Sequence, residues 1–219
     1  MKRAILGLAL GAALGTSVQA AAVWSLSEGF NDISTLPAAG WVQTNNSVPI
    51  GSTGWFQGNP GIFPAAAGPA NSYIGANFLN AALGGMADNW LMTPEVHIDD
   101  GTHLKFALRL LGDGFLDTVE VRLSTSGASS NVADFGMLLA TYSSSVDTGW
   151  LNELIVLSGL GGPTNGRVAF HYVAANTNID GNYIGIDSVS IPEPSTTALF
   201  GIALLGVVLH RRRKATARG

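Results

Sequence analysis

Oxygen-bearing side chains are the residues of this sequence best suited to chemistry, because Ca²⁺ takes six to eight oxygens from carboxylates, amides and backbone carbonyls. Glu28 and Asp32 lie early in the acidic part of the chain, Asp187 lies near its end, and Asn77 and Asp88 lie between them. If the first and last strands of the fold are neighbours, Glu28 and Asp32 approach Asp187, and Asn77 or Asp88 adds further ligands. The pattern predicts bound Ca²⁺. The alternative is that Glu28 is a strand-end charge and Asp187 a buried hydrogen-bond acceptor.

No catalytic constellation stands out in the sequence. His97, His103 and His171 lie in strand-like segments without the close spacing of a zinc or copper site, so a metal would require them to converge in space. The Gly-x-Ser-x-Gly elbow of serine hydrolases does not occur. Glycoside hydrolysis needs two carboxylates about 5–10 Å apart in a cleft, and nothing in the sequence favours such a pair. We therefore expect no enzyme activity and assign no catalytic residues.

Tryptophan side chains are the candidates for carbohydrate contact, because aromatic faces pack on the C–H surfaces of sugars. Trp is large and usually well buried, and Trp41 and Trp90 lie in pieces that match a known family described below, so both are expected to be structural. Trp55 lies in a segment rich in Gly, Pro, Asn and Ala that runs from residue 43 to residue 71. We expect this segment to be a long surface excursion pinned by Trp55 and Phe56, and Trp55 is the candidate among the tryptophans for exposed contact with sugar. The alternative is that Trp55 anchors the excursion to the core.

Charge is distributed unevenly along the chain. The whole sequence has a formal charge of −4, but residues 21–191 hold four Lys and Arg against fourteen Asp and Glu, a formal charge of −10. Nucleic-acid binding depends on clustered Lys and Arg, so this composition argues against a nucleic-acid partner. Cysteine is absent, which excludes disulfide scaffolds, iron–sulfur clusters and thiol catalysis.

Period-two alternation predicts an all-β fold for residues 21–191. In His103–Leu110 the apolar side chains share one face and the charged ones the other. Residues 118–124 and 166–172 repeat this alternation, and weaker strands are expected at 23–30, 72–77, 89–92, 137–142, 152–157 and 183–191. Asp99-Asp100-Gly101 predicts a hairpin turn, because Asp-Gly suits positive φ. About nine strands with one wet face each favour a two-sheet, jelly-roll-like sandwich.

The first twenty residues have the order of a secretory signal peptide. Lys2 and Arg3 form a positive start, an apolar stretch follows, and Val18 and Ala20 are small residues placed three and one before a cut. We expect signal peptidase to cleave after Ala20, which makes Ala21 the first residue of the exported protein.

The last segment, residues 192–219, predicts a single short transmembrane helix with a basic tail. Two prolines, Pro192 and Pro194, flank Glu193 and end the last strand. An apolar run over residues 198–209 follows and leads directly into Arg211, Arg212 and Arg213. Lys and Arg prefer the cytoplasmic side, so the run enters the membrane from outside.

This three-part order of Pro192-Glu193-Pro194, apolar helix and arginine cluster resembles the PEP-CTERM sorting signal of Gram-negative bacteria. The resemblance implies an exosortase-like membrane protease that cuts near the Pro-Glu-Pro motif. It also implies transient anchoring in the inner membrane, followed by transfer to the cell surface or to an exopolysaccharide matrix. The alternative is a simple C-terminal membrane anchor.

The middle of the chain resembles a second family, the choice-of-anchor J domain, which is related to cleaved-adhesin and MAM-like jelly rolls. The matching pieces run in order across residues 28–41, 88–94, 104–106, 117–124, 167–172 and 185–190. The resemblance implies a jelly roll and supports structural calcium near the first and last strands. Ser188 stands where relatives often carry a second Asp, which removes one potential ligand.

These observations predict an exported, non-enzymatic surface or matrix protein, associated with exopolysaccharide or biofilm and sorted through its C-terminal motif. The first alternative is a carbohydrate-binding module that acts alone. The second is a secreted polysaccharide hydrolase. A row of exposed aromatic side chains would favour the first alternative, and a convergent carboxylate pair in a deep groove would favour the second.

Overall fold

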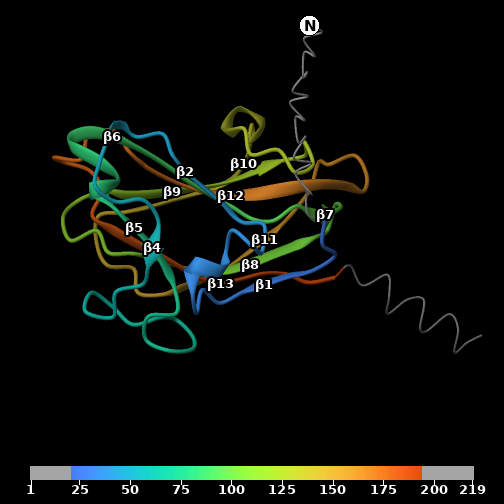
Figure 1. Ribbon diagram of the computed structural model, residues 1–219, viewed down its shortest axis with the longest axis horizontal. Coiled ribbons are helices and arrows are strands. Elements are labelled where there is room, and N and C mark those ends of the chain that lie inside the picture. The colour runs from blue at the N-terminus through green and yellow to red at the C-terminus, as the bar shows by residue number, and fades with distance from the viewer. Residues whose placement is uncertain (1–20, 194–219) are drawn as a thin grey trace, which may run out of the picture.

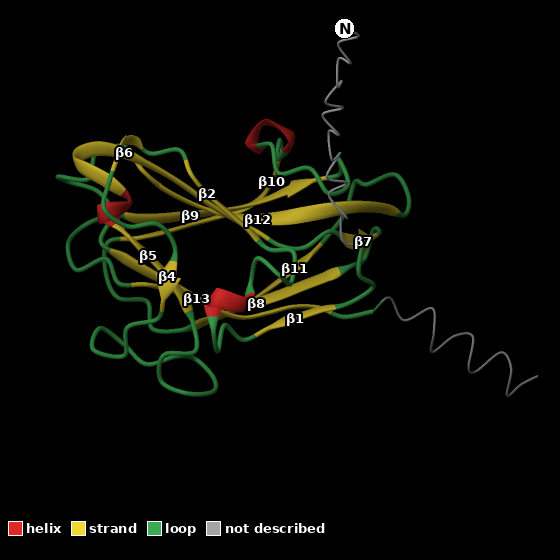
Figure 2. Cartoon of the chain, viewed as in Figure 1, coloured by secondary structure: helices red, strands yellow, loops and turns green. Residues whose placement is uncertain are grey.

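The computed structural model describes residues 21–193, which form two antiparallel β-sheets packed face to face (Figures 1 and 2). This confirms the all-β, two-sheet expectation. The predicted signal peptide, Ala20, Pro194, the C-terminal helix and Arg211, Arg212 and Arg213 lie outside the described residues. Among residues 21–193, no helix has the length and apolar character needed to cross a membrane.

The six-stranded sheet has the order β11-β8-β13-β5-β4, with β1 paired to the C-terminal end of β13. Its strands are β1 (Leu26–Glu28), β4 (Phe56–Gln57), β5 (Ile74–Asn77), β8 (His103–Leu110), β11 (Leu151–Val156) and β13 (Tyr183–Ile191). Leu26 lies opposite Ile191 and Glu28 lies opposite Val189. The first and last strands are therefore neighbours, which is the condition for Glu28 to approach Asp187.

The seven-stranded sheet has the order β10-β9-β12-β6-β2, with β3 paired to β6 and β7 paired to β12. Its strands are β2 (Val42–Asn45), β3 (Val48–Ile50), β6 (Ala81–Met92), β7 (Val96–Ile98), β9 (Asp117–Ser124), β10 (Met137–Ser144) and β12 (Thr164–Ala174). Three short 3-10 helices complete the described fold: η1 (Ile33–Thr35), η2 (Phe78–Asn80) and η3 (Val132–Asp134).

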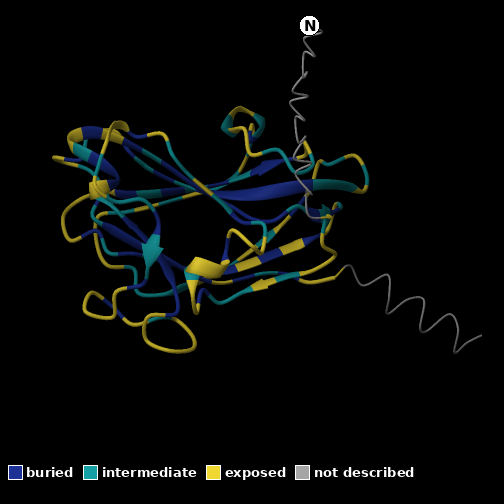
Figure 3. Cartoon of the chain, in the orientation of Figure 1, coloured by how far each residue is buried: buried dark blue, intermediate teal, exposed yellow. Residues whose placement is uncertain are grey.

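The core lies between the sheets and follows the alternation in the sequence. On β8, Leu104, Phe106, Leu108 and Leu110 are buried, whereas His103 is exposed. The same alternation holds along β9, whereas residues 166–170 of β12 are buried on both faces, including Arg167, which was expected on the exposed face. In Figure 3 the central strands of the two sheets are mostly buried, and many of the connecting loops are exposed. Burial of these apolar side chains is the main favourable contribution to folding.

The segment from residue 43 to residue 71 is more structured than the sequence indicates. It contributes most of β2 and all of β3 and β4, so it extends both sheets instead of leaving them. These strands are two to four residues long. Alternation cannot be recognised over so few residues, which explains why the pattern missed them.

The turn at Asp99-Asp100-Gly101 is present, but it does not close a hairpin. The N–H of Thr102 donates to the carbonyl of Asp99 at 3.0 Å, and Gly101 has φ +90°. The turn joins β7 of one sheet to β8 of the other. The expectation of a hairpin was wrong because local turn chemistry does not reveal which strands pair.

Candidate functional site

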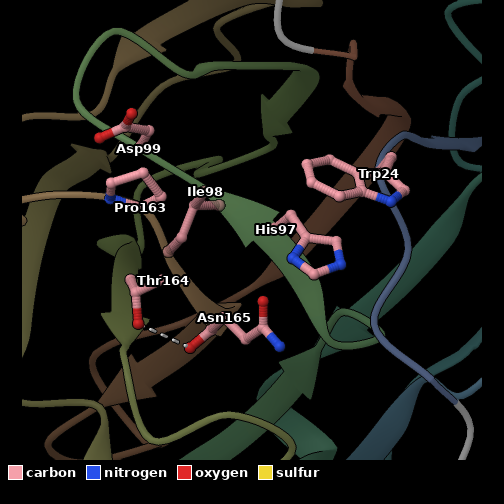
Figure 4. A pocket seen from close by; sticks show the side chains of 7 residues that line it. All are labelled: Trp24, His97, Ile98, Asp99, Pro163, Thr164 and Asn165. Atoms are coloured by element: carbon pink, nitrogen blue, oxygen red, sulfur yellow. Dashed lines mark hydrogen bonds between the residues drawn. The ribbon is translucent and has the colours of Figure 1, made fainter.

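An open groove of about 280 Å³ lies beside β7 and the start of β12 (Figure 4). We call it the Trp24 groove. Trp24 is 62% exposed and stacks on His97, with ring centroids 3.9 Å apart and an angle of 24° between the planes. Its other lining residues are Ile98, Asp99, Pro163, Thr164 and Asn165.

Backbone hydrogen bonds hold Trp24 in this place. The N–H of Val23 donates to the carbonyl of Glu95, and the N–H of His97 donates to the carbonyl of Val23, each at 2.9 Å. The floor is equally fixed, because β7 pairs with β12 and places His97 opposite Asn165. The groove is therefore built on strand pairing and not on a free loop.

The Trp24 groove combines an aromatic face with polar side chains. His97 covers one face of the indole, and the 62% exposure of Trp24 leaves the rest of the ring open to solvent. Asp99, Thr164 and Asn165 bring acceptors and donors to the same groove. This arrangement can hold a ligand that has both apolar C–H faces and hydroxyl groups.

Trp55, the expected sugar-binding residue, is buried. It is 7% exposed, belongs to the main core cluster, and its indole nitrogen has no hydrogen-bond partner in the described part of the chain. The residue directly precedes β4, which folds back onto β5 and carries the indole inward. Trp55 therefore anchors this segment to the core, as expected, and its candidacy as an exposed sugar-binding residue was wrong. Composition marks a surface excursion but does not reveal which of its side chains point inward.

The five expected calcium ligands do not converge into one site. Asp32 caps η1 by accepting from the N–H of Ser34 at 3.0 Å, and Asn77 caps η2. Asp88 lies on β6 of the seven-stranded sheet, away from β1 and β13. In residues 21–193 no three or more His, Asp or Glu side chains form a group placed to hold a metal.

Glu28 and Asp187 are the two expected ligands that the fold brings to neighbouring strands. Oε1 of Glu28 accepts from the N–H of Phe30 at 2.7 Å. Asp187 is buried, and its two oxygens accept from the N–H groups of Ala67 at 3.0 Å and Ser188 at 2.6 Å. Burial raises the pKa of Asp187, and these hydrogen bonds oppose the rise.

A polar row crosses β6, β12 and β9, with His171 at its centre. Nε2 of His171 lies 2.7 Å from Oδ1 of Asp88, and Nδ1 lies 3.2 Å from Oε2 of Glu120. Arg122 donates to the same Glu120 oxygen at 2.7 Å, and Trp90 stacks on the imidazole with centroids 3.7 Å apart. Asp88 lies on the seven-stranded sheet and Asp187 on the six-stranded one, so the two carboxylates do not meet.

The pKa values in this row follow from burial and charge. Burial lowers the pKa of His171, although the hydrogen bonds with Asp88 and Glu120 act in the opposite direction. Burial alone would raise the pKa of Glu120, but the hydrogen bonds from Arg122 and His171 outweigh it and lower that pKa. The row is a structural network across three strands.

Residues 190–214 match the PEP-CTERM protein-sorting motif. The chain carries a PEP-CTERM motif. The match starts at the end of β13 and includes Pro192, Glu193 and Pro194 and the arginines at 211–213, as the sequence predicted. Pro192 and Glu193 are exposed. No curated protein matches this PEP-CTERM chain.

The folded part of the PEP-CTERM chain is similar to solved cleaved adhesin domains. The K1 cleaved adhesin domain of Lys-gingipain from Porphyromonas gingivalis W83 is 24% identical with a TM-score of 0.58, covering 78% of this chain and 98% of that domain. The K2 domain of Lys-gingipain is 18% identical with a TM-score of 0.57, over 78% of this chain and 98% of the domain. These likenesses show a cleaved-adhesin-like jelly roll.

The exposure of Trp24, at 62% the most exposed Phe, Trp or Tyr side chain in residues 21–193, was not expected from the sequence. Trp24 lies two residues before β1, and nothing in its local sequence separates it from the buried tryptophans. Its position ahead of the first strand is the one feature of the sequence that favours exposure, because side chains there have fewer neighbours. The stacking partner His97 could not be foreseen, because its contact depends on the pairing of Val23 with Val96.

Proposed function

We propose that this protein is an exported, non-enzymatic surface or matrix protein that is sorted through its PEP-CTERM motif. Signal peptidase removes residues 1–20, and the C-terminal segment holds the chain in the inner membrane of a Gram-negative cell. An exosortase then cuts near Pro192–Pro194. The sandwich passes to the cell surface or to an exopolysaccharide matrix, where it takes part in biofilm cohesion.

The observation that carries this proposal is the junction between the fold and the motif. Ile191 is 1% exposed and pairs with Leu26, whereas Pro192 and Glu193 are exposed directly after it. A protease can therefore bind this segment without opening the sandwich. The folded unit keeps all of its strands after the cut.

Replacement of the motif tests the sorting step. In a host that has an exosortase, Pro192→Ala, Glu193→Ala and Pro194→Ala combined should leave the uncut chain in the inner membrane, while the parent is released. Pro69→Ala, an exposed proline far along the chain from the junction, is the matched control and should be released normally. Equal release of the triple variant and the parent would contradict the proposal.

We also propose that the sandwich contacts carbohydrate at the Trp24 groove. An exposed indole held rigidly above polar side chains favours this second function, which makes the protein a carbohydrate binder within the matrix. Retention on a column of exopolysaccharide from the producing cells tests it. Trp24→Ala should elute earlier than the parent, and Phe115→Ala, which removes an exposed aromatic ring outside the groove, is the control. Co-elution of Trp24→Ala with the parent would show that the Trp24 groove does not bind the exopolysaccharide.

The absence of catalysis is part of the proposal. His171 and its two carboxylates are committed to one another and to Arg122 and Trp90, which argues against a role as a free acid–base pair. Incubation of the exported protein with soluble polysaccharides should release no new reducing ends. A steady release that His171→Gln abolishes would make the protein a hydrolase.

Calcium binding remains a proposal and is confined here to Glu28 and Asp187. Calcium sites also use backbone carbonyls and amide oxygens, so these two carboxylates on neighbouring strands can supply the acidic ligands. An exported domain without disulfides would gain stability from an ion that binds the folded state alone.

A further inference from the structure

A second cavity lies where β4, β5 and the start of β13 meet, and we call it the distal cavity. Its volume is about 490 Å³, within the range of ~300–1,000 Å³ that is usual for small-molecule sites. Amide and aromatic side chains supply much of its lining: Phe56, Asn59, Asn77, Phe78, Asn182 and Tyr183.

The lining of the distal cavity is neutral. None of the residues that line it carries a charge, so a charged ligand would lose hydration without meeting a counter-charge. Amide side chains both donate and accept hydrogen bonds, as sugar hydroxyls do. The C–H faces of a sugar ring can pack on Phe56 or Phe78. This lining suits a neutral saccharide.

Three of the lining amides hold hydrogen-bonding capacity that residues 21–193 do not use. Oδ1 of Asn77 caps η2, but its amide nitrogen has no partner in the described part of the chain. Among the same residues, the amide nitrogen of Asn59 is also unused. Asn182 donates its amide nitrogen to the carbonyl of Gly112 at 3.0 Å and keeps its side-chain oxygen free within this range. The residues that line the cavity thus keep two donors and one acceptor that the described part of the chain does not use.

The walls of the cavity are held in place before any ligand arrives. The hydroxyl of Tyr183 lies 3.0 Å from that of Tyr73 and accepts from the N–H of Asn59 at 3.3 Å. Buried Asp117 accepts from the N–H groups of Asn182 at 2.6 Å and Tyr183 at 3.3 Å. Such preorganisation lowers the entropy cost of binding.

The distal cavity and the Trp24 groove lie at opposite ends of the sandwich. Tyr183 begins β13 and Ile191 ends it, a separation of ~26 Å at ~3.3 Å per residue. The cavity includes Tyr183, whereas Trp24 lies two residues before Leu26, the partner of Ile191. Figure 1 shows β4 and β5 at one end and β7 at the other.

We propose that the distal cavity binds a neutral saccharide unit, and that the two sites together let one molecule bridge two polysaccharide segments. The bridging rests on the proposed carbohydrate contact at the Trp24 groove; the distal site stands without it. When one site has bound a polysaccharide, the second site meets neighbouring polysaccharide at a high effective concentration, so the overall affinity exceeds that of either site alone.

Asn77→Asp tests the distal site without loss of the helix cap. Aspartate caps helices as well as asparagine does, so the fold is kept, while the amide donor is replaced by an acceptor and a charge enters a neutral cavity. Asn131→Asp is the matched control, since Asn131 caps η3 in the same way outside the cavity. Binding of the exported protein is measured by affinity gel electrophoresis in galactomannan, a neutral polysaccharide, and in alginate, a charged one.

The expected result is retardation in galactomannan and none in alginate. Asn77→Asp should weaken the affinity for galactomannan about tenfold or more. Asn131→Asp should be retarded as strongly as the parent. Equal retardation of Asn77→Asp and the parent, no retardation in galactomannan, or retardation in alginate alone would each overturn the distal site. None of these variants touches the PEP-CTERM segment, so release of the protein from cells reports on the proposed function separately.

Bridging of two polysaccharide segments by one molecule is measured separately. Light scattering of galactomannan should rise when the parent protein is added, and both Trp24→Ala and Asn77→Asp should abolish the rise. Scattering that stays flat with the parent, or that either variant leaves intact, would show that one molecule does not join two segments.

Discussion

Nε2 of His171 lies 2.7 Å from Oδ1 of Asp88, so a histidine on β12 is joined to a carboxylate on the neighbouring strand β6. Glu120 on β9 approaches the other ring nitrogen at 3.2 Å. The contact ties three strands of the seven-stranded sheet together on one face. Its strength depends on protonation, which makes the stability of the fold dependent on pH.

Acidification should destabilise the protein through His171. Burial lowers the pKa of His171 in the folded state, so the unfolded chain takes up a proton first, near pH ~6.5. The stability contribution of neutral His171 is therefore present above this pH and is lost as the pH falls below it. The free energy of unfolding from urea titrations should drop between pH 7.5 and pH 5 more in the parent than in His171→Gln.

Two controls isolate this effect. His103→Gln removes an exposed histidine and should keep the parent's pH profile. Burial raises the pKa of Asp117 and of Asp187, and these groups act in the opposite direction, so the difference between the parent and His171→Gln is the quantity to compare. Identical profiles for these two proteins would contradict the role of His171.

Tryptophan replacements should separate the buried indole from the exposed one. Trp55→Ala removes a side chain from the core and should lower the free energy of unfolding by about 3–5 kcal/mol. Trp24→Ala removes one that is 62% exposed and should change it by about 0.5 kcal/mol or less. Denaturant melts of both variants test this order. The reverse order would contradict the placement of both side chains.

Asp117→Asn should destabilise the end of the sandwich that carries the distal cavity. The carboxylate accepts from the N–H groups of Gly112, Asn182 and Tyr183 and from the hydroxyl of Tyr172. An amide nitrogen cannot accept, so at least one buried donor loses its partner, at a cost of about 1–3 kcal/mol.

Chemical denaturation measures that loss, and Asp113→Asn is its matched control. Asp113 is an exposed aspartate in the loop that precedes Asp117, and its replacement should cost about 0.5 kcal/mol or less. Equal effects of the two substitutions would mean that the four hydrogen bonds of Asp117 do not support the fold.

Calcium should raise the melting temperature if Glu28 and Asp187 supply its acidic ligands. An ion that binds only the folded state stabilises it by mass action, so millimolar Ca²⁺ should raise the melting temperature and EDTA should lower it. Glu28→Gln should remove this response, and Asp113→Asn should keep it. A melting temperature that neither Ca²⁺ nor EDTA changes would contradict calcium binding by the folded protein.

Long alternating strands are predictable from this sequence, and short ones are not. The bounds expected for residues 103–110 and 183–191 are those of β8 and β13, because a half-buried strand of this length carries several apolar side chains on one face. β3 has three exposed residues, Val48, Pro49 and Ile50, so it has no buried face for a pattern to mark. Its pairing with β6 is set by tertiary context.

The candidate site was harder to predict than the fold. The neighbouring positions of β1 and β13 were expected and are present, which brought Glu28 and Asp187 to paired strands. The degree of burial of Trp55 and of Trp24 was hard to predict, because it depends on tertiary pairing: β4 pairs with β5 next to Trp55, and Val23 pairs with Val96 next to Trp24. The neutral distal cavity joins residues from Thr53 to Tyr183, and no local pattern in the sequence indicates such a convergence.

In the proposed function, residues 1–20 and 192–219 serve transport, and the sandwich between them is the working protein. The measurement that decides this is the intact mass of the native protein recovered from outside the cell. We expect a chain that begins near Ala21 and ends near Pro192–Pro194. A full-length C-terminus on protein that remains in the membrane would contradict it and would make the chain an ordinary anchored protein.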